Sequence, residues 1–255
     1  MNTRLSKIDE IRGLTLISMI LYHFLWDLRF IAGFNIEWYT GPVGYVWQKS
    51  ICVCFIFISG FCFSMGKNRL KRSSIVFLCG IVISAVTLFF MPENRVVFGI
   101  LTFIGTAGII TIPLDKLHRK LEKKLGEAKL NLTLVIGTLL LFIVFFNLNN
   151  GYLFCMKRIE LPGYLFSGYV ETFFGFTDPN FFSTDYFAIF PWIFNYLLGY
   201  YTYRFLMSVM KERVESALSK DRFTWASCIG RHTLLIYMLH QPVLYLITLI
   251  LQRIF

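Results

Sequence analysis

Seven long apolar segments, separated by charged stretches, are the feature that most limits what this chain can fold into. A helix needs about 20 predominantly apolar residues to cross the hydrocarbon core of a bilayer. The segments of suitable length lie at 11–33, 46–66, 73–91, 96–114, 130–148, 186–205 and 228–252. Only 16% of the residues are charged, whereas soluble domains carry about 25%. The sequence therefore predicts an all-α, polytopic integral membrane protein with about seven transmembrane helices.

One further apolar stretch, residues 161–176, fits this pattern less well. It contains Pro162, three glycines and Glu171. Backbone that is not helical must be buried in protein at membrane depth. We therefore expect this stretch to re-enter the membrane or to lie on the outer surface. As an eighth span it would disturb the charge distribution described next.

The distribution of basic residues predicts how the helices are oriented. With seven spans, 19 of the 25 Lys and Arg residues fall at one set of helix ends and their loops. Cytoplasmic loops of membrane proteins carry the excess of Lys and Arg, so we expect the N-terminus inside and the C-terminus outside. The formal net charge of +10 then follows from topology, and we expect no nucleic-acid partner.

The most basic inner loop, residues 115–129, has leucines at helical spacing among lysines. Two structures fit this pattern, a short helix lying in the inner membrane interface or an extension of the fourth span. His118 lies in this loop. We expect its side chain to be solvated or interfacial.

Ionisable residues at membrane depth are costly and mark candidate functional sites. In the first span, His23 and Asp27 are four residues apart, so they share one helix face and can touch. A carboxylate can fix the tautomer of an adjacent imidazole, and histidine suits general-base catalysis near neutral pH. Asp27 as a solvated helix end is the alternative.

Arg12 precedes His23 by 11 residues, which is about 16 Å along a helix. This spacing places a cation at the cytoplasmic mouth and a base deep in the membrane. It suits a long anionic donor whose charged end stays inside while its reactive end reaches outward. Arg12 as a simple inner-face anchor is the alternative.

The last span carries a second set of polar residues. Arg231 and His232 mark its inner end, and His240 and Gln241 lie near its centre. Asn195 lies in the 186–205 segment, four residues after Pro191. For His240, a hydrogen bond that only joins two helices is an equally good interpretation.

Four segments, taken in order, resemble a known family: KIDEIRGLTLISMILYHFLWDL, FIFISGF, FAIFPWIFNYLLGYY and IGRHTLLIYMLHQPVLY. They are similar to bacterial membrane proteins related to the catalytic domain of heparan-alpha-glucosaminide N-acetyltransferase. That group belongs to a broader superfamily of transmembrane acyltransferases. An Arg and a His separated by ten residues in the first span recur there, here Arg12 and His23. The resemblance runs from about residue 7 to about residue 245.

The resemblance implies a single acyltransferase domain over residues 1–255, placed in a bacterial cytoplasmic membrane. Acetyl-CoA, or another acyl-CoA, would be the cytoplasmic co-substrate. The acceptor would be a hydroxyl or amine of an extracytoplasmic saccharide. Direct transfer from CoA and an acylated histidine intermediate both remain open, as do an acetyl and a longer acyl donor.

Site roles follow from combining the resemblance with the residue chemistry. His23 would be the catalytic base and Asp27 would orient it. Arg12, Arg231 and His232 would bind the phosphates of acyl-CoA. The residues left to contact the developing oxyanion or the acceptor are Asn195, His240 and Gln241.

The outer stretch 149–185 is a candidate platform for the acceptor. It is rich in Tyr and Phe, which suit sugar rings, and in carboxylates that suit hydroxyl groups. The carboxylates are those of Glu160, Glu171, Asp178 and Asp185.

No permanently bound cofactor and no metal are expected. Cys52 and Cys54 point to opposite sides of a helix, which makes a poor metal site. The expected partners are acyl-CoA, the saccharide and the lipid bilayer, and a homodimer is left open.

Three rival functions are considered for the same residues. A transporter or flippase for a glycan or lipid would use them as a pathway, although no internal repeat supports it. A haem protein would use His23 and His240 as axial ligands. A structural subunit would leave the His–Asp pair unexplained.

Overall fold

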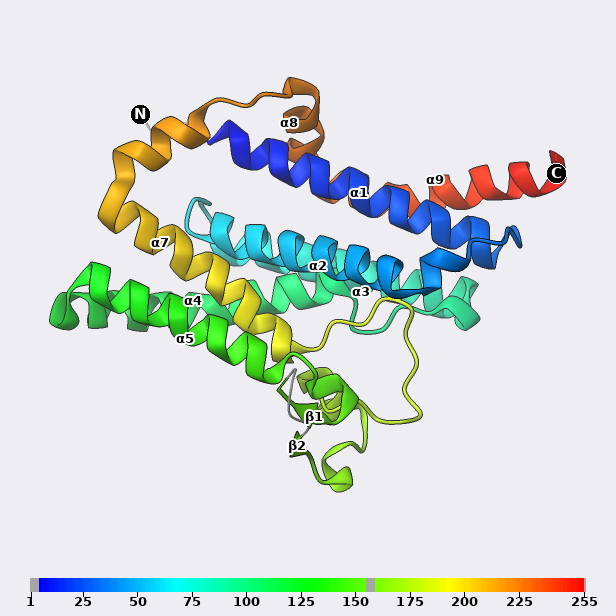
Figure 1. The fold of residues 1–255 in the computed structure, drawn as a ribbon, viewed down its shortest axis with the longest axis horizontal. Coiled ribbons are helices and arrows are strands. Elements are labelled where there is room, and N and C mark those ends of the chain that lie inside the picture. The colour runs from blue at the N-terminus through cyan, green and yellow to red at the C-terminus, as the bar shows by residue number, and fades with distance from the viewer. Residues whose placement is uncertain (1–4, 155–158, 255) are drawn as a thin grey trace. The chain divides into compact units, whose positions relative to one another are not determined.

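The computed structural model describes residues 5–154 and 159–254. Within these ranges the structure is almost entirely helical, which confirms the predicted all-α fold (Figure 1). The long helices are α1 (Ser6–Phe30), α2 (Pro42–Phe63), α3 (Arg69–Phe90), α4 (Ile100–Leu125), α5 (Glu127–Phe145), α7 (Ile189–Ser219) and α9 (Thr233–Ile254). Two shorter helices are α6 (Tyr169–Phe174) and α8 (Thr224–Arg231).

Six of these helices are long and apolar enough to cross a membrane: α1, α2, α3, α4, α5 and α9. The remaining predicted span, 186–205, overlaps in sequence with the first part of α7. This helix is long enough, but its Tyr, Asn and Pro residues lower its mean hydropathy. A multi-pass membrane protein is therefore confirmed, and a count of seven spans stays a prediction.

Two helix boundaries differ from the expected ones. The loop predicted at 115–129 is helical to Leu125, because α4 continues past Pro113 and ends only where Gly126 adopts a φ of +84°. The interpretation as an extension of the fourth span is therefore the correct one. The span predicted at 228–252 is divided instead, because α8 ends at Arg231 and α9 begins at Thr233.

The stretch 161–176 forms two short elements, a 3₁₀ turn η4 (Gly163–Leu165) and the six-residue helix α6. A span needs about 20 residues, so this stretch is not an eighth transmembrane helix. An antiparallel pair of strands, β1 (Tyr152–Leu153) and β2 (Ile159–Glu160), precedes it. Three other 3₁₀ turns are η1 (Glu37–Thr40), η2 (Pro92–Asn94) and η3 (Leu148–Asn150).

The chain divides into two compact units. The terminal unit contains the residues up to Phe55 and those from Met210 onward, and the central unit comprises Ile56–Val209. The boundaries fall inside α2 and α7. The assignment of residues 1–255 to one acyltransferase domain stays a prediction.

In the terminal unit, α1 packs against both α8 and α9. The approach of α1 to α8 is close because glycines face backbone on both sides. A Cβ on Gly13 would collide with the carbonyl oxygen of Ala226, and a Cβ on Gly230 would collide with that of Asp9. Close backbone approach at small residues is typical of helix packing in membranes.

In the central unit, α3 and α4 run side by side (Figure 1). Gly80 faces the backbone at Thr102, and Gly105 faces the backbone of Phe77. The side chains of Phe103 and Tyr200 are almost fully buried there. This unit therefore has a tightly packed interior of its own.

Candidate active site

Helices α1 and α9 bring four of the predicted site residues together in the terminal unit. The carboxylate of Asp27 is fully buried, at 0% exposure. Its Oδ1 accepts a hydrogen bond of 2.8 Å from the side-chain amide of Gln241. The rings of His23 and His240 lie next to each other, with centroids 5.1 Å apart and planes tilted by 54°. Residues more than 200 positions apart in the chain thus form one polar cluster, which we call the α1–α9 cluster.

The geometry of Asp27 excludes the alternative interpretation and corrects one part of the main one. Asp27 is buried, so it is not a solvated helix end. Its Oδ1 pairs with Gln241, and within residues 5–154 and 159–254 no hydrogen bond joins it to His23. The shared helix face of His23 and Asp27 was predicted correctly, but the direct contact expected between them is not formed.

His240 has one nitrogen in a defined hydrogen bond. Its Nδ1 lies 2.5 Å from the backbone carbonyl oxygen of Tyr237. A carbonyl oxygen can only accept, so Nδ1 carries the hydrogen in the neutral ring. The other nitrogen, Nε2, then has a free lone pair. His240 in this form cannot donate to an oxyanion from Nε2, which is one of the two roles expected of it.

The predicted donor-side residues lie at the inner end of the same unit. Arg12 Nη1 lies 3.5 Å from Asp9 Oδ1 and 3.4 Å from the carbonyl oxygen of Gly230. Arg231 and His232 are exposed at the junction of α8 and α9, where His232 Nδ1 lies 3.0 Å from the carbonyl oxygen of Cys228. The exposed guanidinium of Arg231 at this end is accessible to an anionic ligand.

Asn195 lies elsewhere in the chain. It is in α7, belongs to the central unit and is 0% exposed. It is therefore not one of the residues that the terminal unit brings together.

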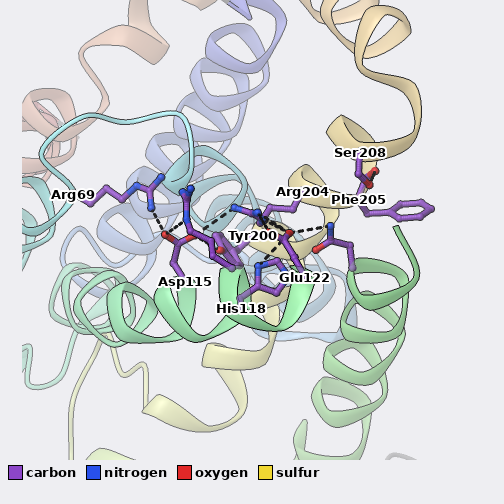
Figure 2. Close-up of polar contacts among 10 residues, drawn as sticks. Arg69, Asp115, His118, Glu122, Tyr200, Arg204, Phe205 and Ser208 are labelled. Atoms are coloured by element: carbon purple, nitrogen blue, oxygen red, sulfur yellow. Dashed lines mark hydrogen bonds and ion pairs between the residues drawn. The ribbon is translucent and has the colours of Figure 1, made fainter. Parts of the chain in front are cut away.

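A second polar cluster, which sequence reasoning missed, joins α4 to α7 in the central unit (Figure 2). Asp115 accepts hydrogen bonds from Arg69 at 2.7 Å, Arg119 at 3.0 Å and the hydroxyl of Tyr200 at 2.5 Å. Glu122 accepts two bonds of 2.6 Å from Arg204 Nη2. We call this group the α4–α7 cluster.

His118 belongs to the α4–α7 cluster, so its expected exposure was wrong. Its side chain is 2% exposed, with Nδ1 3.5 Å from Glu122 Oε1 and the ring beside Tyr200 and Tyr201. Asp115, His118 and Glu122 recur at a spacing of three and four residues, which is one helix face. That spacing was the available signal, but the surrounding lysines favoured an exposed loop.

Two carboxylates of the outer stretch 149–185 accept hydrogen bonds from backbone N–H groups. Asp178 accepts bonds of 2.8 Å from the N–H groups of Gly168 and Asn180, which hold the pKa of this carboxyl below its ordinary value. Asp185 accepts a bond of 3.1 Å from the N–H of Ile100 at the start of α4. Asp178 thus shapes the stretch itself, and Asp185 connects its end to α4. Its use as an acceptor platform stays a prediction, and residues 155–158 lie outside the described part of the chain.

The fold and the α1–α9 cluster define an integral, multi-pass membrane protein with a buried carboxylate and two adjacent histidine rings between two helices. Residues 4–242 match the family model described as Heparan-alpha-glucosaminide N-acetyltransferase, catalytic. Because the match covers most of the chain, the protein belongs to this family. Its class of function is that of a transmembrane acyltransferase. Searches of curated proteins and of solved structures found no match.

Proposed function

We propose that the protein transfers an acyl group from cytoplasmic acyl-CoA to a hydroxyl or amine of an extracytoplasmic saccharide. The reaction takes place at the α1–α9 cluster, with His23 as the catalytic base, in a bacterial cytoplasmic membrane. The observation that carries this proposal is the juxtaposition of His23 and His240 beside the buried Asp27–Gln241 pair. Ionisable groups at such depth are costly to bury and are usually retained for function.

The chemistry requires a base near the acyl carbon. His23 removes the proton of the acceptor hydroxyl or amine as its oxygen or nitrogen attacks the thioester carbonyl. The C–S bond then breaks, and the CoA thiolate receives the proton. A positioned base of this kind contributes about 10²–10⁴-fold to the rate.

The donor binds at the inner end of the terminal unit. Arg12 and the exposed Arg231 supply positive charge for the CoA phosphates, and arginine forms strong, directional bonds with phosphate oxygens. His232 is exposed next to Arg231 and lines the same site. Helix α1 is unbroken between Arg12 and His23, and this segment is about 16 Å long. The reactive end of an extended donor therefore reaches His23 while its phosphates stay at the cytoplasmic surface.

Binding and slow hydrolysis of acetyl-CoA by the detergent-purified protein test this proposal. We expect the wild type to bind and turn over acetyl-CoA. Arg12→Ala should weaken binding, and His23→Ala should keep binding but lose turnover. Arg253→Ala is the matched control, because it removes an exposed cation at the far end of α9 and should change neither property.

Two outcomes contradict the proposal. One is turnover by His23→Ala equal to that of the wild type. The other is a lack of acetyl-CoA binding by the wild type, which would favour the transporter or flippase hypothesis. A transport assay in vesicles would then be the next measurement.

A further inference from the structure

The α1–α9 cluster contains three buried polar atoms without a hydrogen-bond partner among the described residues. They are Asp27 Oδ2, His240 Nε2 and Gln241 Oε1. A buried polar atom left unpaired destabilises the fold. Three such atoms in neighbouring residues therefore indicate that hydrogen-bond partners are supplied later. These partners come either from a substrate that binds or from a neighbouring side chain that moves slightly.

All three atoms are acceptors. Asp27 has no hydrogen to donate when ionised. The bond from Gln241 to Asp27 must come from the amide NH₂, so Oε1 is the atom left over. His240 Nε2 carries a lone pair and no hydrogen, because the hydrogen of the neutral ring is on Nδ1 and is donated to the carbonyl of Tyr237. What this cluster lacks is therefore a donor.

His23 is the side chain beside it that can supply one. A neutral imidazole has one N–H and one lone pair. If the lone pair takes the proton of the acceptor substrate, the N–H on the opposite side of the ring needs a partner of its own. The ring next to it is that of His240. Asp27, the partner expected from the sequence, binds Gln241 through Oδ1 and has a second, unpaired oxygen. The choice between the two residues therefore rests on the His240 ring, which lies next to that of His23.

We propose that His240, and not Asp27, is the positioning residue of His23, accepting the His23 N–H at its Nε2. The proposal rests on the proposed function of the cluster. The direction of the hydrogen bonds from His23 through His240 to Tyr237 is fixed at one end. The carbonyl of Tyr237 accepts the bond there, so the hydrogen stays on His240 Nδ1. His240 therefore holds hydrogen on the near nitrogen of His23 and leaves the far nitrogen as the base.

The proton steps balance within this arrangement. The acceptor O–H or N–H gives its proton to the free nitrogen of His23, while a new bond forms to the acyl carbon. The C–S bond breaks, and the His23 imidazolium returns that proton to the departing thiolate. His240 loses and gains no proton. It orients the neutral ring and stabilises the charged one through a single hydrogen bond, as a carboxylate does in acyl-transfer triads.

Two isosteric substitutions of His240 separate this role from simple packing. In His240→Asn, the amide NH₂ replaces Nδ1–H and can still bind the Tyr237 carbonyl, but no atom replaces Nε2. In His240→Gln, the longer side chain can place its carbonyl oxygen near the former position of Nε2. Hydrogen-bond acceptance is therefore lost in the first variant and kept in the second.

The experiment measures kcat and KM for acetyl-CoA consumption by the full-length protein, together with thermal stability. We expect His240→Asn to lower kcat by about 10²-fold with KM for acetyl-CoA unchanged, and His240→Gln to recover at least a tenth of wild-type kcat. Asp27→Asn keeps an oxygen for Gln241, and it should reduce kcat far less than His240→Asn does.

Four results would overturn the positioning role of His240, and they differ in which other role or function they still support. Equal losses of kcat and of stability in both His240 variants would leave a packing role for this residue. A greater loss in Asp27→Asn than in His240→Asn would assign the positioning role to Asp27. If wild type and His23→Ala consume acetyl-CoA at the same rate, the proposed function fails, and the positioning role fails with it. Normal kcat in His240→Asn with an inactive His23→Ala overturns only the role of His240.

Discussion

The two polar clusters each contain at least one histidine and one carboxylate, yet they differ in how the carboxylates are balanced. In the α4–α7 cluster, Asp115 and Glu122 are paired with arginines. In the α1–α9 cluster, Asp27 accepts from the neutral amide of Gln241 instead. The α4–α7 cluster thus has its charges satisfied within the protein. The α1–α9 cluster keeps acceptor atoms available.

This difference indicates different uses for similar side chains. Breaking a buried ion pair is costly because one charge stays behind without its partner. Changes in the α4–α7 cluster should therefore act on stability. Both clusters keep polar atoms without a hydrogen-bond partner, and those of the α4–α7 cluster include the ring nitrogens of His118. The α1–α9 cluster, however, has no ion pair to lose among the described residues, so changes there should act on turnover.

The largest expected effect comes from the histidines themselves. His23→Gln should lower acetyl-CoA turnover by about 10²–10⁴-fold, the usual contribution of a positioned base, with thermal stability close to that of the wild type. His118→Gln is the matched change in the other cluster, and its turnover per folded molecule should stay within about twofold. Similar turnover losses in both variants would remove the distinction between the clusters.

The carboxylates provide the next test. Glu122→Gln removes the closer charged partner of Arg204 and leaves the longer ion pair of 3.4 Å with Asp115. Complete loss of a buried partner costs about 3–5 kcal/mol, so the loss here should approach but not exceed this range. Asp27→Asn removes no cation's partner among the described residues and should cost markedly less. Denaturation of both variants in the same detergent would measure the two costs. A more stable Glu122→Gln than Asp27→Asn would contradict the comparison.

A smaller loss is expected when one hydrogen bond of the α4–α7 cluster is removed. Tyr200→Phe deletes the hydroxyl that donates to Asp115, and a hydrogen bond to a charged group contributes about 1.5–3 kcal/mol. Arg69 and Arg119 still balance the carboxylate, so the melting temperature should fall less than in Glu122→Gln. Turnover per folded molecule should not change.

Helix packing in the terminal unit gives the last of these tests. Gly13→Ala would place a Cβ against the carbonyl of Ala226, and overpacking of this kind costs about 1–3 kcal/mol. Gly137→Ala is its control, because a Cβ there has no neighbour within 4 Å. That change should instead raise stability slightly, since Ala favours a helix over Gly. Equal melting temperatures of Gly13→Ala and Gly137→Ala would show that the close contact of α1 with α8 does not limit the stability of the protein.

Most of the fold could be predicted from sequence because long apolar runs leave few alternatives to membrane helices. The shared face of His23 and Asp27 was also predictable, since four residues in a helix fix it. The pairing of Asp27 with Gln241 was not, because it joins positions 214 residues apart and depends on how α1 packs against α9. His118 was misplaced for a related reason. Its lysine neighbours suggested exposure, while the partners that bury it lie in α7.

Helix α1 has a further consequence because it is unbroken from Ser6 to Phe30. Each residue of a helix advances by about 1.5 Å and turns by about 100°. One residue added between Arg12 and His23 would therefore turn His23 away from His240 while lengthening the segment only slightly. Only additions of about a whole turn would keep His23 facing His240. The depth at which this protein can act on a donor can thus change during evolution only in discrete steps of about 5 Å.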